Sequence, residues 1–374
     1  MAQHATRSRS STTVLLRCLL ALALLAPSGV LFVQLWTSVG DRLAVARLER
    51  QGLEYLNRLG QLTIAMTDAQ SAAIAGQPFP RDAITRAVEA VGSVDTSIGG
   101  ELRTHERWSA LRAKVEALAS MSITDPTSAY ATYSEATDLL LALYEKVRDN
   151  SQLIRDQDAD AYYLQDGAAQ ELPEAVVAAG RFADLAVMAV GRPRSDAATT
   201  TANLLNARDA VISPANDLAA DLQAAVDGTS SRTLSSNLLS RLDRFRRSMD
   251  TLTATTVPVD GRTPVDVGAL QRVRAEVQAS ASELATAILA ELDGLISARI
   301  DNLDRQRLIA AGTLAAAGLL ALIPVGALFG RPRRRPDAEP PTPPTPPYAA
   351  GDGRPLDGLE PAVELSRREP TGAR

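Results

Sequence analysis

The sequence predicts an all-α protein: two membrane-spanning helices that flank an extracytoplasmic bundle of long helices, arranged as two stacked four-helix-type bundles. Three observations lead to this fold class. Aromatic residues make up only 4% of the 374 residues, whereas the strong helix formers Ala, Leu, Arg and Glu are abundant. Apolar residues recur in steps of three and four, without the alternation typical of strands. Two uncharged apolar segments lie toward the ends of the chain.

The periodic segments are about 30 to 45 residues long, which exceeds the average helix of a globular protein. In each of them the apolar positions form a seam along one side of the predicted helix. The seam positions are, in chain order, Leu48, Gly52, Tyr55, Leu59, Leu62 and Met66; Ala136, Leu140, Leu143, Val147, Asn150 and Ile154; Val176, Gly180, Ala183, Val187 and Val190; and Val273, Val277, Leu284, Ile288, Leu292 and Leu295. Heptad spacing sustained through several helices predicts a coiled-coil-like bundle with knobs-into-holes packing.

The two uncharged segments divide the chain into five parts. Residues 18–36 and 308–329 each reach the roughly 20 residues that a helix needs to cross about 30 Å of hydrocarbon. We therefore predict transmembrane helices there and an extracytoplasmic, sensor-like helical domain over 37–307. Residues 1–17 form a short cytoplasmic N-terminus, and the Pro-rich residues 330–374 form a disordered cytoplasmic tail.

The flanking charges predict the orientation in the plasma (inner) membrane. Arg7, Arg9 and Arg17 precede the first segment, and an Arg cluster at 331–335 follows the second. By the positive-inside rule, the protein is a two-pass membrane protein with both termini cytoplasmic.

The first segment is also consistent with a cleaved signal peptide, because small residues at 26–28 follow a positively charged N-terminal region. An anchor is favoured, since the chain becomes apolar again immediately afterwards and Trp36 occupies an interfacial position.

Charge and the scarcity of Cys and His exclude several function classes. Residues 37–307 hold 28 basic and 37 acidic residues, a net charge of −9, so no nucleic-acid partner is expected. The chain has a single Cys, Cys18, which excludes an intramolecular disulfide and a Cys-rich zinc site. It has only two His, His4 and His105, so a His-based catalytic triad or metal cluster is not expected. The acidic run from Asp156 lacks the Gly and Glu that an EF-hand loop requires. We therefore expect that the protein is not an enzyme and binds neither a metal nor a cofactor.

Two motifs carry a resemblance to a known family. Residues 49–56 read ERQGLEYL, and residues 150–166 read NSQLIRDQDADAYYLQD with Leu172-Pro173 shortly after. They resemble the opening helix and the mid-domain motif of the extracellular helical sensor region of bacterial methyl-accepting chemotaxis receptors and membrane sensor kinases. The resemblance covers residues 14–329. It implies a helical bundle that senses a small ligand or the state of the envelope.

Two departures limit what the resemblance implies. Gln157 stands where the family usually has Pro. After the second apolar segment the family continues into a HAMP linker and an output module, whereas only 45 residues remain here, including a polyproline II stretch at 340–347. We therefore expect a sensor-like protein that acts through a separate signalling or envelope protein.

Six residues are candidate ligand contacts: Arg50, Asn150, Arg155, Asp158, Tyr162 and Tyr163. Asn150 occupies a seam position, so it either contacts a ligand between helices or fixes the helix register or a cap. For Asp158 a helix cap is the favoured alternative, and for the two Tyr a role in packing is favoured. Arg50 and Arg155 have the chemistry to clamp a carboxylate.

Several alternatives concern partners. A membrane scaffold that binds another envelope protein, and signals nothing, is consistent with the same helices. Gly312 and Ala316 form a small-xxx-small pair that favours a homodimer. The tail is either a disordered spacer or a ligand for an SH3-like groove. His105 and Trp108 lie in a polar stretch and are expected at the surface or an interface.

Overall fold

The computed structural model describes residues 5–121, 123–153, 159–190, 192–228, 232–254 and 266–329. Within these ranges every regular element is helical, so the predicted all-α class is confirmed. The α-helices are α1 (Ala5–Ile74), α2 (Arg81–Leu102), α3 (His105–Ser120), α4 (Pro126–Asn150), α5 (Ala159–Asp166), α6 (Leu172–Ala189), α7 (Ala197–Gly228), α8 (Arg232–Thr253) and α9 (Val267–Phe329). A π-helical turn, η2 (Gly167–Glu171), joins α5 to α6, and a 3-10 turn, η3 (Arg194–Asp196), precedes α7.

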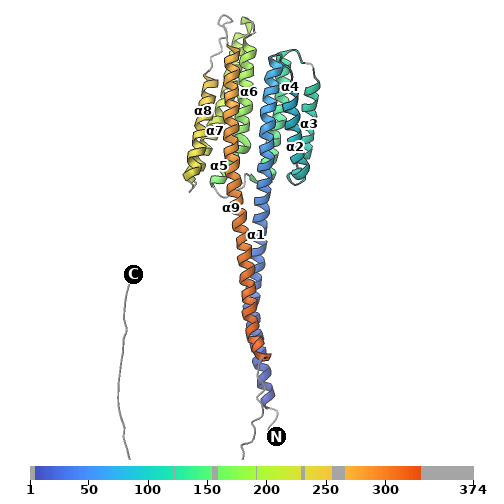
Figure 1. The fold of residues 1–374 in the computed structure, drawn as a ribbon, viewed down its shortest axis with the longest axis vertical. Helices are drawn as coiled ribbons and strands as arrows, with labels where there is room; N and C mark the ends of the chain where they lie inside the picture. Colours follow the sequence, from blue (N-terminus) through green and yellow to red (C-terminus); the bar gives the residue numbers. More distant parts are fainter. Residues whose placement is uncertain are drawn as a thin grey trace, which may run out of the picture. The chain divides into compact units, whose positions relative to one another are not determined.

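The helices form two bundles that lie side by side (Figure 1). One contains the C-terminal half of α1 with α2, α3 and α4, and the other contains α6, α7, α8 and the first half of α9. Helix α6 packs against both α1 and α4, and this contact joins the bundles. The prediction of stacked bundles was therefore wrong, because α1 and α9 run alongside each other and place their bundles at the same height.

Most of the predicted seam positions lie in the core. Tyr55, Leu59 and Leu62 of α1 are fully buried, as are Leu140 and Leu143 of α4 and Leu284 and Leu292 of α9, whereas Leu295 is partly buried. Val190 departs from the prediction, because it follows the last residue of α6 and its side chain is exposed. Ile154 lies outside the described residues.

Trp108 is buried, so the expectation that it lies at the surface was wrong. Its side chain is only 5% exposed, although its sequence neighbours are polar. Trp108 shares a face of α3 with Leu111, Val115 and Leu118, which are buried in the same core. Its indole lies beside Gly92 of α2, where an added Cβ would make an ordinary van der Waals contact with the ring at 3.7 Å.

Below the bundles, α1 and α9 continue as a pair. Val39, Leu43 and Leu303 form a small apolar cluster between them. Glu49 accepts a hydrogen bond from Arg299 at 3.1 Å, and the Arg307 guanidinium lies 5.0 Å from the centre of the Trp36 ring. These contacts hold the two helices side by side where they leave the bundles.

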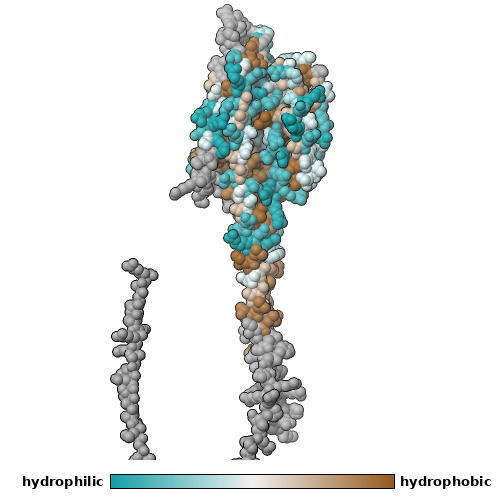
Figure 2. Space-filling view, in the orientation of Figure 1, coloured by the Kyte–Doolittle hydropathy of each residue, from teal (hydrophilic) through white to brown (hydrophobic). Residues whose placement is uncertain are grey.

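Large apolar side chains are exposed on both helices beyond this point (Figure 2). They are Leu16, Leu19, Leu22, Val30, Leu31, Val33, Leu35 and Trp36 of α1, and Leu308, Ile309, Leu319, Leu320 and Leu322 of α9. None of the helices, over the residues that the structure describes, is long and apolar enough to cross a membrane.

Candidate functional site

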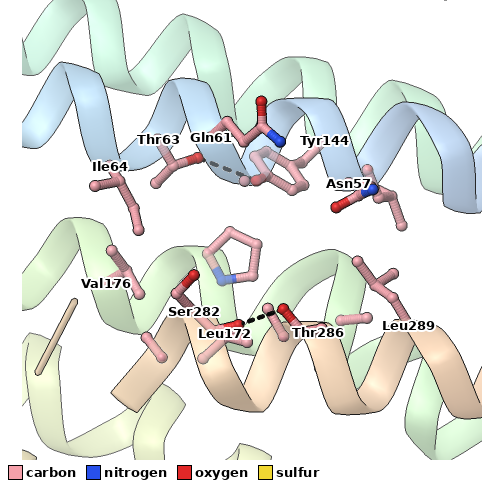
Figure 3. Close-up of a pocket in the computed structure, with 16 residues that line it drawn as sticks. Asn57, Gln61, Thr63, Ile64, Tyr144, Leu172, Val176, Ser282, Thr286 and Leu289 are labelled. Carbon is pink, nitrogen blue, oxygen red and sulfur yellow. Dashed lines mark hydrogen bonds between the residues drawn. The ribbon is translucent and has the colours of Figure 1, made fainter. Parts of the chain in front are cut away.

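A groove of about 390 Å³ lies between the two bundles (Figure 3). Helix α1 forms one wall and α9 the opposite wall, with α6 and Tyr144 of α4 completing the lining. The lining residues are Leu56, Asn57, Gly60, Gln61, Thr63, Ile64, Tyr144, Ala168, Leu172, Pro173, Val176, Ala281, Ser282, Ala285, Thr286 and Leu289. Concave, mainly apolar sites of this size are typical of small-molecule binding.

Small residues keep the groove open. Gly60 of α1 has no side chain, and a Cβ there would meet only the Tyr144 hydroxyl, at 3.9 Å. Ala281 and Ala285 are four residues apart, so both lie on the same face of α9. Larger side chains at these positions would fill the space between α1 and α9.

The polar groups of the groove are uncharged. Thr63 Oγ1 and the Tyr144 hydroxyl are hydrogen-bonded at 3.0 Å in the buried floor, and burial raises the pKa of Tyr144. Asn57, Gln61 and Ser282 are exposed and lie along the rim. Among the lining residues, which are all described, none is an acid or a base.

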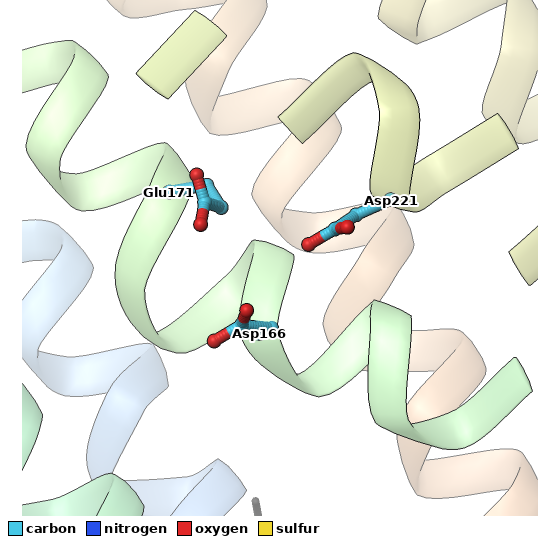
Figure 4. Close-up of side chains that lie close together, drawn as sticks. All are labelled: Asp166, Glu171 and Asp221. Carbon is cyan, nitrogen blue, oxygen red and sulfur yellow. The ribbon is translucent and has the colours of Figure 1, made fainter. Parts of the chain in front are cut away.

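A second feature is a group of three carboxylates from α5, η2 and α7 (Figure 4). Oxygen atoms of Asp166, Glu171 and Asp221 lie within 4.8 Å of one another. Burial, followed by repulsion from the neighbouring carboxylates, raises the pKa of Glu171 to about 7 and that of Asp221 to about 6. Such a group has the ligand chemistry for a hard cation such as Ca²⁺.

The π-helical turn places Glu171 in this group. Pro173 has no N–H to donate to the carbonyl four residues earlier, so the regular α-helical ladder cannot continue through it. The Leu172 N–H instead donates to the Gly167 carbonyl, five residues earlier. The extra residue in the turn changes the direction of the following side chains, as π-bulges do.

A buried carboxylate lies higher between the bundles. Asp184 of α6 is 2% exposed and accepts hydrogen bonds from Gln70 Nε2 at 2.9 Å and Ser71 Oγ at 2.5 Å, both on α1. Burial raises its pKa to about 6. Next to it, Arg274 of α9 pairs with Asp68 of α1 at 3.0 Å. These contacts tie α1, α6 and α9 together above the groove.

None of the four predicted contact residues that the structure describes lines the groove. Arg155 and Asp158 lie outside the described residues. Asn150 Nδ2 donates to the Leu102 carbonyl at 2.7 Å, so its amide links the end of α4 to the end of α2. Arg50 pairs with Asp293 at 3.0 Å in an exposed position.

The two predicted tyrosines meet edge to face, with ring centres 5.4 Å apart. Tyr163 packs against the core, whereas Tyr162 lies close enough to Asp166 for that carboxylate to raise the pKa of its hydroxyl. Neither the groove nor the carboxylate group was predicted from the sequence. The available signal was the small residues in the α1 and α9 segments.

Comparisons with known proteins give no independent assignment. No family model, no curated protein and no solved structure matches this chain. The geometry of the described residues is therefore the basis of the functional proposal.

Proposed function

We propose that this protein is a two-pass membrane sensor whose groove binds a small molecule and changes the relation of α1 to α9. One observation carries the proposal. The two opposite walls of the groove belong to α1 and α9, and these two helices continue without a break to the exposed apolar segments. A ligand between them would therefore act directly on the two elements that leave the bundles.

The membrane location is supported by the exposed apolar side chains of α1 and α9. Exposed apolar surface of this extent marks a membrane or protein interaction site. Trp36 and Arg307 lie together at the bundle-side end of this surface, as residues of a membrane interface do. By the positive-inside rule, the Arg residues that flank both segments support cytoplasmic termini and an external position for residues 37–307.

The coupling mechanism is a small shift of one packed helix along the other. Packed helices move past each other by about 1–2 Å in many signalling proteins. A ligand can shift such an equilibrium only by its difference in affinity for the two states. The groove satisfies this condition if the separation of α1 and α9 differs between the states. In this proposal a separate partner reads the shift.

Disulfide cross-linking of the full chain in lipid nanodiscs tests the proposal. In a Cys18→Ser background, Val39→Cys with Leu303→Cys places one pair between α1 and α9 below the groove. A control pair, Ser248→Cys with Ser280→Cys, joins α8 to α9, where the two hydroxyls lie 2.8 Å apart. Compounds that raise the unfolding midpoint are selected first from organic acids, amino acids, nitrate, divalent ions and neutral aromatics.

We expect a stabilising compound to change the cross-linking rate of the α1–α9 pair at least twofold and to leave the control pair unchanged. If stabilising compounds leave both rates unchanged, the sensor proposal is wrong, and a non-signalling membrane scaffold becomes the better assignment. Recovery of a stoichiometric envelope protein with the full chain would then support the scaffold.

A further inference from the structure

We infer that the groove selects an uncharged molecule with a mainly apolar body and one or two hydrogen-bonding groups. This ligand class follows from the lining of the groove, and its role as a signal rests on the proposed function. This ligand class differs from the one that the predicted contact residues favour, since Arg50 and Arg155 have the chemistry to clamp a carboxylate.

The absence of charge in the lining excludes ions as ligands. The walls consist mainly of apolar side chains, among them Leu56, Ile64 and Leu172, and none of the described lining residues is charged. Transfer of an unpaired charge into such surroundings is strongly unfavourable. Above the groove, Asp68 and Arg274 pair with each other at 3.0 Å.

The polar groups favour a carbonyl or hydroxyl on the ligand. The side-chain amides of Asn57 and Gln61 each offer two N–H donors and one carbonyl acceptor. On the opposite wall, the Thr286 hydroxyl already donates to the Ser282 carbonyl at 2.8 Å, so it remains available as an acceptor. The polar groups of the ligand are therefore expected at the rim, because Thr63 and Tyr144 in the floor are already hydrogen-bonded to each other.

The size and height of the groove favour a free small molecule over a membrane lipid. A volume of about 390 Å³ is at the lower end of the range for drug-sized ligands. Along α1 and α9 the groove lies about 20 residues from Trp36 and Leu308, which corresponds to roughly 30 Å of helix. The acyl chain of a lipid that stays in the proposed bilayer would not reach it.

Photo-labelling with a matched pair of probes tests the inference. Benzophenone is neutral and has one carbonyl acceptor, and 4-benzoylbenzoate is the same molecule with an added carboxylate. The full chain is irradiated with each probe, and the labelled peptides are mapped by mass spectrometry. Mapping separates labels in the groove from labels in the apolar segments of α1 and α9.

We expect benzophenone to label α1 and α9 residues of the groove at least fivefold more than 4-benzoylbenzoate does. Ala285→Leu should reduce this labelling at least fivefold, because the added side chain fills the groove. Ala290→Leu, on the exposed face of the same helix, should leave it unchanged. Gly60→Leu is a second filling variant on the opposite wall, in case Ala285→Leu lowers the unfolding midpoint.

Three results would overturn the inference: no benzophenone label in the groove, equal labelling by the anion, or labelling that both filling variants leave intact. The cross-linking test gives a separate answer about signalling. Selective labelling without any change in the α1–α9 cross-linking rate would retain the ligand class and reject the sensor. A cross-linking response to an anion alone would retain the sensor and reject the ligand class.

Discussion

The apolar side chains of helix α1 are buried in one region of the molecule and exposed to solvent in another. In the bundle, Leu59 and Leu62 are 0% exposed, because α2, α4 and α6 pack around this part of α1. Near the other end of the same helix, Leu16 and Leu31 are 61% and 65% exposed. Helix α9 shows the same contrast, with Ile288 fully buried in the bundle and a largely exposed apolar surface beyond Leu308.

The contrast lies in the surroundings, because the residue types are the same. A helix that is apolar on all sides is stable only inside a protein core or a bilayer. One neighbouring helix cannot cover all sides of such a segment. In the proposed function, lipid covers the exposed half of the α1–α9 pair.

Truncation of a leucine in each region should produce the largest difference. Leu62→Ala is expected to reduce the free energy of unfolding by about 2–5 kcal/mol, because it removes a fully buried side chain from the core. Leu31→Ala should change it by less than about 0.5 kcal/mol, as substitutions of exposed residues do. Urea unfolding of the full chain in one detergent measures both. Equal losses would show that the exposed segment is packed against protein in solution.

Within the bundle, two glycines of α1 also differ in how closely their surroundings are packed. A Cβ on Gly52 would overlap the Ser151 side chain, whereas a Cβ on Gly60 would make only one ordinary contact. Gly52→Ala should therefore destabilise the fold by about 1–3 kcal/mol through overpacking. Gly60→Ala should stabilise it by up to about 1 kcal/mol, because Ala favours the helix. Thermal unfolding separates the two, and a loss at Gly60 would mean that the groove closes on α1.

The sequence was sufficient to predict the helical class and the burial of most seam positions, because helical periodicity is a local property. Leu59, Leu140 and Ile288 could be assigned to the core from their own segments alone. Trp108 obeys the same rule, because it precedes Leu111, Val115 and Leu118 in steps of three, four and three, and the expectation of a surface position followed its polar neighbours instead. Local periodicity gives no information on which bundle lies beside which, so the side-by-side arrangement was missed.

The sites were not predictable for the same reason. The groove combines residues from α1 and α9, more than 200 positions apart in the chain, and it depends on small residues that resemble ordinary helix-packing positions. The carboxylate group needs Asp221 of α7 beside Glu171, whose direction depends on a π-helical turn. Neither juxtaposition follows from residue spacing within one segment.

Protonation of the carboxylate group should give a smaller, pH-dependent effect. The pKa of Glu171 is raised from 4.5 to about 7, so folding favours its protonated form. This contribution to stability is present below pH 4.5 and is lost as the pH rises to 7. Glu171→Gln should therefore be more stable than the wild type at pH 8, by about 1 kcal/mol or roughly 2 °C in the midpoint. The difference should shrink steadily toward pH 5.

Calorimetry at pH 5 and pH 8, in a chelator, measures this difference. Glu54→Gln, which changes an exposed carboxylate on α1, is the matched control and should shift the midpoint by less than about 1 °C at either pH. A Glu171→Gln protein that is less stable than the wild type at pH 8 would show that the ionised carboxylate has a stabilising partner.

The smallest effect is expected for Arg50, which pairs with Asp293 across the α1–α9 pair. Both side chains are about half exposed, at 56% and 49%, so water and salt screen the interaction. A double-mutant cycle of Arg50→Ala and Asp293→Ala should give a coupling energy below about 1 kcal/mol that vanishes in 1 M salt. Arg50→Ala should also leave benzophenone labelling of the groove unchanged, because Arg50 is outside its lining. A variant that folds normally but no longer responds to any stabilising compound would restore Arg50 as a ligand contact, and would move the binding site from the groove to the exposed face of the helix pair.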